Sequence, residues 1–167
     1  MSLSIVTWNY QDRDRGQCRS VWRELTEWHR EIYQDSTIGG GHPEDYFDKH
    51  LAKVGPKQIW VAVHESKVVG MAGLIIEENE AEIEPLIVSK AYRGKGVGTQ
   101  LIKTVVAEAR KLGVKFLIVG PVARNINAIK FLYKQGFKTL GNVELCMCFG
   151  DYAWEQGPKL FWCKFKY

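Results

Sequence analysis

The chain of 167 residues is 46% hydrophobic and 25% charged and has a net charge of +4, which suits a single globular domain over residues 1–167. Its Lys and Arg residues are scattered rather than gathered into the basic stripe of a nucleic-acid-binding surface, and no apolar run approaches the ~20 residues of a membrane helix. Because the N-terminus has no signal-peptide pattern, we expect a cytoplasmic protein with neither nucleic-acid nor membrane partners.

The first third of the chain is expected to form one short strand, residues 3–8, and two helices. The first helix spans residues 16–33, and the second opens at Pro43, because proline fits the first helical turn. Residues 35–42, with three consecutive glycines, form the connection. Apolar residues at helical spacing mark the buried faces, namely Val21, Leu25, Trp28 and Ile32, then Phe47, Leu51 and Val54.

The middle of the chain is predicted to form three consecutive strands, residues 58–64, 68–77 and 81–89, joined by short polar turns as an antiparallel meander. A glycine-rich loop follows, and then a helix over residues 98–112. The next strand, residues 115–120, is joined to residues 81–89 through this helix, which implies a parallel crossover between the two strands.

The last part of the chain is predicted to hold one helix and two strands. Asn125 is a good N-cap for a helix that reaches Gln135 and ends at Gly136. Residues 137–149 and 159–167 are predicted as the final strands, and exposed strand edges favour a homodimer. Together the elements indicate one mixed α/β sheet with helices on both faces.

Four cysteines, Cys18, Cys146, Cys148 and Cys163, occur without a Cys-x-x-Cys pair. Cys146 and Cys148 lie two apart in a predicted strand and therefore point to one face. We expect buried free thiols and no metal site, because neither the cysteines nor the four histidines have recognisable ligand spacing.

The segment from Glu82 to Gly98 carries the functional information. A strand leads into a loop with three alternate glycines, and a long helix begins there. The unpaired N–H groups and positive dipole end of such a helix form an anion site of diphosphate size. A P-loop is excluded because Thr99-Gln100 follows the last glycine, and a dinucleotide fingerprint is excluded because its third glycine is replaced by Thr99.

What remains, Arg93-x-x-Gly96-x-Gly98, resembles the coenzyme A signature of the GNAT superfamily of N-acetyltransferases. A second motif, Asn125-x-x-Ala128 ending in Gly136-Phe137, is similar to the GNAT segment beside the pantetheine arm. The order of elements also matches, so the resemblance covers nearly the whole chain. It implies a single GNAT-like domain with a mostly antiparallel sheet and a splayed parallel strand pair.

The resemblance implies acetyl-CoA as the donor, with its diphosphate on the backbone N–H groups of residues 93–99 and its thioester carbonyl near the backbone of Val88. Arg93 and Lys95 would add positive charge beside the diphosphate. The donor-binding residues implied in this way are Leu86, Ile87, Val88, Arg93, Gly94, Lys95, Gly96, Val97, Gly98, Thr99, Asn125 and Ala128.

Pro85 supports this reading independently, because proline inside a central strand removes a hydrogen-bond donor and marks a bulge or an unpaired stretch. In a GNAT-like sheet this strand splays from its parallel neighbour, and the splay holds pantetheine. We expect a bulge over residues 84–86.

An acceptor amine must lose a proton before it attacks a thioester, and a carboxylate can take that proton. Glu82 and Glu84 share parity on their strand and are the candidate bases, each equally well explained as a solvated or ion-paired residue. Glu144 is a weaker candidate. The resemblance places the phenol that protonates the leaving thiolate at Leu132, whereas this chain has Tyr133, about 100° further around the helix, so water is the alternative acid.

The resemblance also places the acceptor pocket between the first two helices. Aromatic residues there, Trp28, Tyr33, Tyr46 and Phe47, are better explained as core than as substrate contacts. Glu24, Glu31 and Asp35 are candidates to attract a cationic acceptor, although a charged helix face is usually solvated.

We therefore expect an N-acetyltransferase that moves the acetyl group of acetyl-CoA to a primary amine of a small molecule, by direct attack through a tetrahedral intermediate. The alternatives are a longer acyl donor, a protein lysine or N-terminal acceptor, and a non-catalytic acyl-CoA-binding sensor. A nucleic-acid-binding module is disfavoured by the lack of a basic stripe.

Overall fold

The computed structural model describes residues 4–150, 154–160 and 163–166. The chain divides into two compact units, Met1–Gly120 and Pro121–Tyr167.

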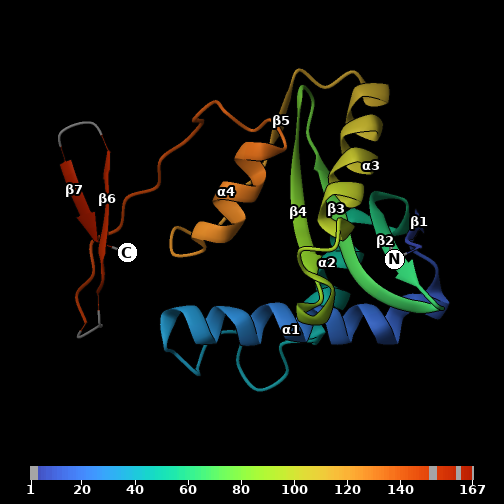
Figure 1. Ribbon diagram of the computed structural model, residues 1–167, viewed down its shortest axis with the longest axis horizontal. Helices are drawn as coiled ribbons and strands as arrows, with labels where there is room; N and C mark the ends of the chain where they lie inside the picture. Colours follow the sequence, from blue (N-terminus) through green and yellow to red (C-terminus); the bar gives the residue numbers. More distant parts are fainter. Residues whose placement is uncertain (1–3, 151–153, 161–162, 167) are drawn as a thin grey trace. The chain divides into compact units, whose positions relative to one another are not determined.

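The first unit is built on a five-stranded sheet in the order β1-β2-β3-β4-β5 (Figure 1). Its strands are β1 (Val6–Asn9), β2 (Ile59–His64), β3 (Lys67–Ile76), β4 (Glu80–Val88) and β5 (Phe116–Ile118). The first four are antiparallel to their neighbours, whereas β5 is parallel to β4. The predicted meander and the predicted parallel crossover are confirmed. The first strand begins three residues later than expected, and Leu3 lies outside the described residues.

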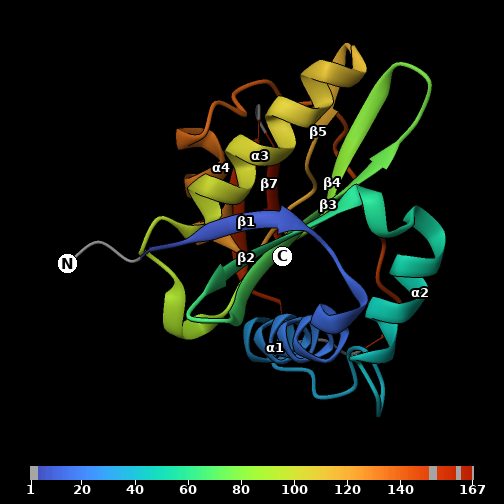
Figure 2. The ribbon, with the colours of Figure 1, turned by 90° about the vertical axis from the view of Figure 1, so that its right-hand side faces the viewer.

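Three helices cover the two faces of this sheet, as predicted (Figure 2). They are α1 (Arg15–Tyr33), α2 (Asp45–Val54) and α3 (Val97–Leu112), and short 3-10 turns occupy η1 (Asp12–Asp14), η2 (Pro56–Gln58) and η3 (Lys90–Tyr92). Helices α1 and α2 share one face and are joined by ion pairs of Arg19 with Asp48 and of Arg23 with Glu44. Helix α3 packs on the other face, where Val97 and Leu101 lie against Gly70 of β3.

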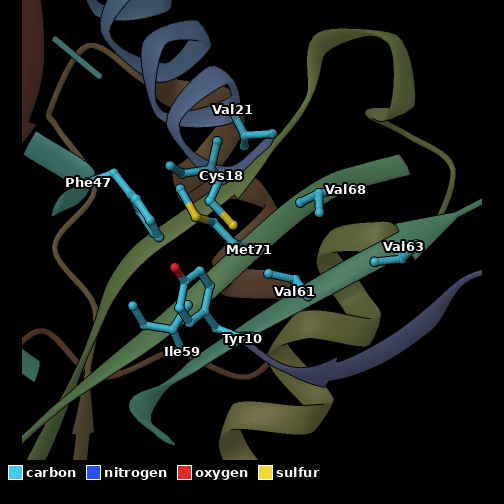
Figure 3. Packing of buried hydrophobic residues seen from close by; sticks show 10 residues of the cluster. Tyr10, Cys18, Val21, Phe47, Ile59, Val61, Val63, Val68 and Met71 are labelled. Atoms are coloured by element: carbon cyan, nitrogen blue, oxygen red, sulfur yellow. The ribbon is translucent and has the colours of Figure 1, made fainter. Parts of the chain in front are cut away.

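The core lies between α1, α2 and the sheet (Figure 3). Its buried members are Tyr10, Cys18, Val21, Phe47, Ile59, Val61, Val63, Val68, Met71 and Ile87. The Phe47 ring is fully buried, with ring centroids 5.6 Å from Tyr10 and 6.2 Å from Trp22. Burying each such side chain contributes about 1.5–3 kcal/mol, so Phe47 serves the core rather than the wall of a substrate pocket.

Strand β4 carries the predicted bulge. Its register with β3 pairs Ile83 with Leu74 and Leu86 with Ala72, so that two residues, Glu84 and Pro85, face the single residue Gly73. A Cβ atom added to Gly73 would lie 2.4 Å from the Glu84 carbonyl oxygen, which is why a glycine stands opposite the bulge. Pairing of β4 with β5 extends only from Glu80 to Glu82. The two parallel strands therefore separate just before the bulge, and this is the predicted splay.

The second unit contains α4 (Ile126–Lys134) and an antiparallel hairpin of β6 (Gln156–Leu160) and β7 (Cys163–Lys166). Asn125 caps α4 as predicted, since its side-chain oxygen accepts a hydrogen bond from the Ala128 N–H group at 3.1 Å. Gly136 follows the helix with a φ of 106°.

Two predictions for this unit are wrong. Residues 137–149 form no strand. The predicted strand over residues 159–167 is wrong because residues 159–160 end β6 whereas residues 163–166 form the separate strand β7; residues 161–162 and 167 lie outside the described residues. Apolar residues alternate along residues 143–149, but alternation makes a strand only where the backbone finds a partner, and this segment pairs with none of the described strands. Consequently Cys146 and Cys148 are exposed rather than buried, as is Cys163, whereas Cys18 is buried as expected.

Candidate functional site

The loop between β4 and α3 is shaped by two glycines with positive φ. After the η3 turn, Gly94 has a φ of 72° and Gly96, the N-cap of α3, has a φ of 86°. These left-handed conformations suit glycine and strain other residues. A Cβ atom added at either position would meet no atom within 4 Å, so the backbone of the loop presents an open face.

The open face of the loop exposes backbone donors. Residues 93–96 form a turn, and the N–H groups of residues 94–99 make no close hydrogen bond within the described part of the chain; no side chain caps α3. The Arg93 N–H, also part of the predicted cradle, instead donates to the Lys90 carbonyl at 3.5 Å. Because helix N-termini also carry a partial positive charge, this arrangement can bind an anion such as a diphosphate.

The two cationic side chains of the loop differ in what they contact. Arg93 Nε donates a hydrogen bond to the Val88 carbonyl at 3.0 Å, and its guanidinium lies 4.9 Å from the centre of the Trp28 ring. Arg93 therefore ties the loop to β4 and α1. Lys95 is exposed, with Nζ 5.4 Å from the centre of the Tyr92 ring, and is the cation that the loop presents to solvent.

The end of β4 has one edge free of strand pairing. The Ser89 N–H donates to the Val69 carbonyl of β3 at 2.9 Å. Since hydrogen-bonding direction alternates along an antiparallel strand, the N–H groups of Leu86 and Val88 point away from β3, toward the side that β5 has left. Ile87 turns its backbone to β3 and its side chain into the core.

The two candidate bases lie at and just before the bulge of β4. Glu82 precedes the bulge, and its carboxylate reaches to within 3.7 Å of a Cβ position at Gly120, just beyond β5. Glu84 lies in the bulge. Its carboxylate is half-exposed, with Oε1 3.8 Å from Nδ1 of His50 in α2.

His50 is a residue of this site that the sequence analysis missed. Its side chain is 5% exposed and lies beside the Trp22 ring, at a centroid distance of 5.5 Å. Burial lowers the pKa of His50, and the Glu84 carboxylate opposes that shift only in part, so the ring is neutral near pH 7. Its position three residues after Phe47, on the buried face of α2, is the signal that could have identified it.

A hollow of about 180 Å³ lies beside α1, between Ser20, Trp28 and Arg93. Glu24, which lines it, accepts hydrogen bonds from the Ser89 hydroxyl and from the Lys90 N–H at 3.0 Å. Glu31 pairs with Lys90 at 3.6 Å. Two of the three predicted attractors of a cationic acceptor, Glu24 and Glu31, therefore contact the start of the glycine loop.

The remaining candidates near α1 and α2 serve local structure. Asp35 accepts two hydrogen bonds from Thr37, which lower the pKa of its carboxyl group. Tyr46 is exposed, with Nζ of Lys49 4.7 Å from its ring centre. Tyr33 is half-buried at the end of α1.

The other predicted site residues belong to the second unit. The Ala128 N–H is bonded to Asn125 and closes the helix cap. Leu132 is buried and Tyr133 is exposed, with Nζ of Lys138 5.5 Å from its ring centre. Glu144 lies exposed in the segment that forms no strand.

Within the described residues, no three His, Cys, Asp or Glu side chains are grouped so that they could hold a metal ion. Of the described helices, none is both long and apolar enough to cross a bilayer.

The sequence matches the model of the acetyltransferase (GNAT) family over residues 22–137. Human N-acetyltransferase 8 is 30% identical over 94 residues, which are 53% of this chain and 41% of that protein. N-acetylaspartate synthetase of Xenopus tropicalis is 37% identical over 87 residues, which are 51% of this chain and 32% of that protein. The chain thus spans less than half the length of these relatives.

Solved structures share the fold. The paiA N-acetyltransferase of Thermoplasma acidophilum, determined with coenzyme A, has a TM-score of 0.71 at 22% identity and covers 84% of this chain and 94% of its own. The aminoglycoside N-acetyltransferase AAC(6′)-Iy, determined with CoA, has a TM-score of 0.64 at 14% identity and covers 90% and 98%.

Proposed function

This chain belongs to the acetyltransferase (GNAT) family, and from that premise we propose that it transfers an acetyl group from acetyl-CoA to a primary amine of a small molecule. One observation carries the proposal. The backbone N–H groups of residues 94–99 make no close hydrogen bond within the described residues and lie at the N-terminus of a 16-residue helix. Such donors suit the diphosphate of coenzyme A.

The edge of β4 supplies the next part of the site. The N–H groups of Leu86 and Val88 face the splay between β4 and β5, where an extended pantetheine arm can lie along the strand. The Val88 N–H is the candidate donor to the thioester oxygen as negative charge develops on it, and fixed donors of this kind stabilise tetrahedral intermediates.

A lysine-like acceptor amine has a pKa of about 10.4 in water, so it is protonated near pH 7. Glu82 or Glu84 removes one proton, and the freed lone pair on nitrogen forms a bond to the thioester carbonyl carbon. Collapse of the tetrahedral intermediate breaks the carbon–sulfur bond. The thiolate of coenzyme A then takes a proton from water or from a phenol, for which the sequence offers Tyr133.

Two other functions are alternatives to acetyl transfer to a small molecule. A protein lysine or an N-terminal amine can serve as acceptor through the same chemistry. A non-catalytic acyl-CoA sensor is favoured by one observation, namely that the position four residues after Ala128 is the buried Leu132 rather than a tyrosine.

The experiment is an acetyl-CoA turnover screen that measures release of free thiol with amines, amino acids and peptides. We expect thiol release with at least one amine and none without acceptor beyond slow hydrolysis. Tight acetyl-CoA binding without turnover on any acceptor would instead support the sensor, and failure to bind acetyl-CoA would refute both.

A further inference from the structure

The bulge of β4 lies over a buried histidine that no step of the proposed reaction uses. His50 extends from α2, and its side chain is almost fully buried. The ring lies near the Trp22 ring on one side, and its Nε2 is 3.2 Å from a Cβ position at Gly73. Any residue larger than glycine at position 73 would press on this ring, so the fold keeps room for it.

The two ring nitrogens of His50 have different surroundings. Nδ1 lies 3.8 Å from Oε1 of Glu84, and Nε2 is buried without a hydrogen-bond partner in the described part of the chain. Two acceptors of Glu84 lie near the ring, its backbone carbonyl and its carboxylate, and the charged carboxylate is the stronger of the two. The ring hydrogen is therefore best placed on Nδ1, where it faces Glu84.

The 3.8 Å separation is longer than a hydrogen bond, whose N–H···O distance is about 2.7–3.2 Å. The Glu84 side chain is half-exposed and can rotate, whereas the buried imidazole is confined by Trp22 and Gly73. A rotation that brought the Glu84 carboxylate within hydrogen-bond distance of Nδ1 would let the fixed imidazole select one orientation of the carboxylate.

Glu82, the other candidate base, has no buried imidazole beside its carboxylate within the described part of the chain. Its carboxylate makes no hydrogen bond or ion pair with the described residues, and it extends toward Gly120 beyond β5. Of the two candidate bases, only Glu84 therefore has a buried group that can set its direction.

We propose that His50 is a positioning residue for Glu84: its Nδ1–H holds the Glu84 carboxylate toward the acceptor amine and makes Glu84, rather than Glu82, the base of the reaction. This inference rests on the proposed acetyl transfer. The proton that leaves the amine nitrogen ends on a Glu84 oxygen, and the nitrogen lone pair forms the new bond to the acetyl carbon. His50 stays neutral and keeps its hydrogen throughout.

The test compares three variants of the full chain, using the acceptor found in the turnover screen. His50→Asn keeps a donor near the position of Nδ1, His50→Gln places its donor near Nε2, and His50→Leu has none. We expect His50→Leu and His50→Gln to lower kcat on the order of 10-fold to 100-fold, with unchanged acetyl-CoA affinity, and His50→Asn to retain most of the activity. Equal activity of the Asn and Gln variants would overturn the inference, and this comparison does not depend on whether the Leu variant folds.

A double-mutant cycle gives a readout that a merely structural role would not move. In the Glu84→Gln background, His50→Leu is expected to lower kcat no further, because the carboxylate that it positions is gone. Independent, multiplying effects would overturn the inference. A wild-type chain without turnover on any amine refutes the proposed function itself, whereas an active wild type with an unaffected His50→Leu variant refutes only the role of His50.

Discussion

The Ser89 hydroxyl lies 3.0 and 2.9 Å from the two carboxylate oxygens of Glu24, which links the middle of α1 to the residue that follows β4. The same carboxylate accepts from the Lys90 N–H, and Arg93 rests on Trp28 one helical turn along α1. Helix α1 thus holds the glycine loop at three points. An acceptor that binds against α1 would therefore contact the same helix that supports the donor loop.

Glu24→Gln is expected to weaken acetyl-CoA binding roughly tenfold, because it removes the charge from the hydrogen bonds that fix the start of the loop. Isothermal titration calorimetry measures this affinity. Glu27→Gln is the matched control, since Glu27 lies in the same helix and pairs with Arg30 rather than with the loop. Equal affinities of the two variants would show that α1 does not support the loop.

Gly96→Val is expected to abolish acetyl-CoA binding, because the side chain fills the open face of the loop. It also forces a β-branched residue to a φ of 86°, at a cost of about 1–2 kcal/mol. Gly113→Val introduces the same kind of strain at the other end of α3, where φ is 72°, and controls for stability. Both variants should lose similar thermal stability, and only Gly96→Val should lose the ligand. Unchanged affinity in Gly96→Val would count against the proposed cradle.

Glu84→Gln is expected to lower kcat on the order of 100-fold to 10,000-fold without changing acetyl-CoA affinity, since it removes the base but no donor contact. Steady-state kinetics with the identified amine measures the change. Glu82→Gln should lower kcat less. The opposite order would assign the base to Glu82.

Phe47→Ala is expected to lower the free energy of unfolding by about 3–5 kcal/mol, because the ring is fully buried between α2 and the sheet. Denaturant unfolding followed by circular dichroism measures the loss. Tyr46→Ala, next to it and exposed, should change stability little. If the Phe47→Ala variant keeps its stability but binds the acceptor weakly, Phe47 is part of the acceptor pocket rather than of the core.

Burial, assisted by Asp14, raises the pKa of the Cys18 thiol to about 12. The thiol stays protonated in the folded state while it ionises above pH 9 in the unfolded chain, so its contribution to stability is present below that pH and is lost as the pH rises toward 12. Cys18→Ala should make the alkaline loss of stability less steep. In native alkylation at about pH 8, just below the usual thiol pKa, the three exposed cysteines should react and Cys18 should not. Rapid labelling of Cys18 would contradict its burial.

Much of the fold was predictable because local signals agreed with tertiary structure. Pro85 predicted the bulge, and the glycine spacing after β4 predicted the open loop, since few other conformations suit those residues. His50 was missed because the helical spacing that places it on the buried face of α2 does not by itself distinguish a functional histidine from a core residue. Its role depends on Gly73 and Glu84, which only the β3–β4 register brings to it.

Other features depend in the same way on tertiary contacts. Arg93 Nε donates to the Val88 carbonyl and its guanidinium lies beside the Trp28 ring, contacts that spacing does not reveal, and its place beside the diphosphate stays a prediction. Residues 143–149 alternate like a strand, yet sequence alone does not supply the partner that a strand requires.

The most direct test of the coenzyme cradle is an amide NMR titration of the chain with acetyl-CoA. We predict that the backbone N–H resonances of residues 94–99 shift most on binding, as expected for amides that become hydrogen-bonded to diphosphate oxygens. Saturable binding that leaves these resonances in place would contradict the account.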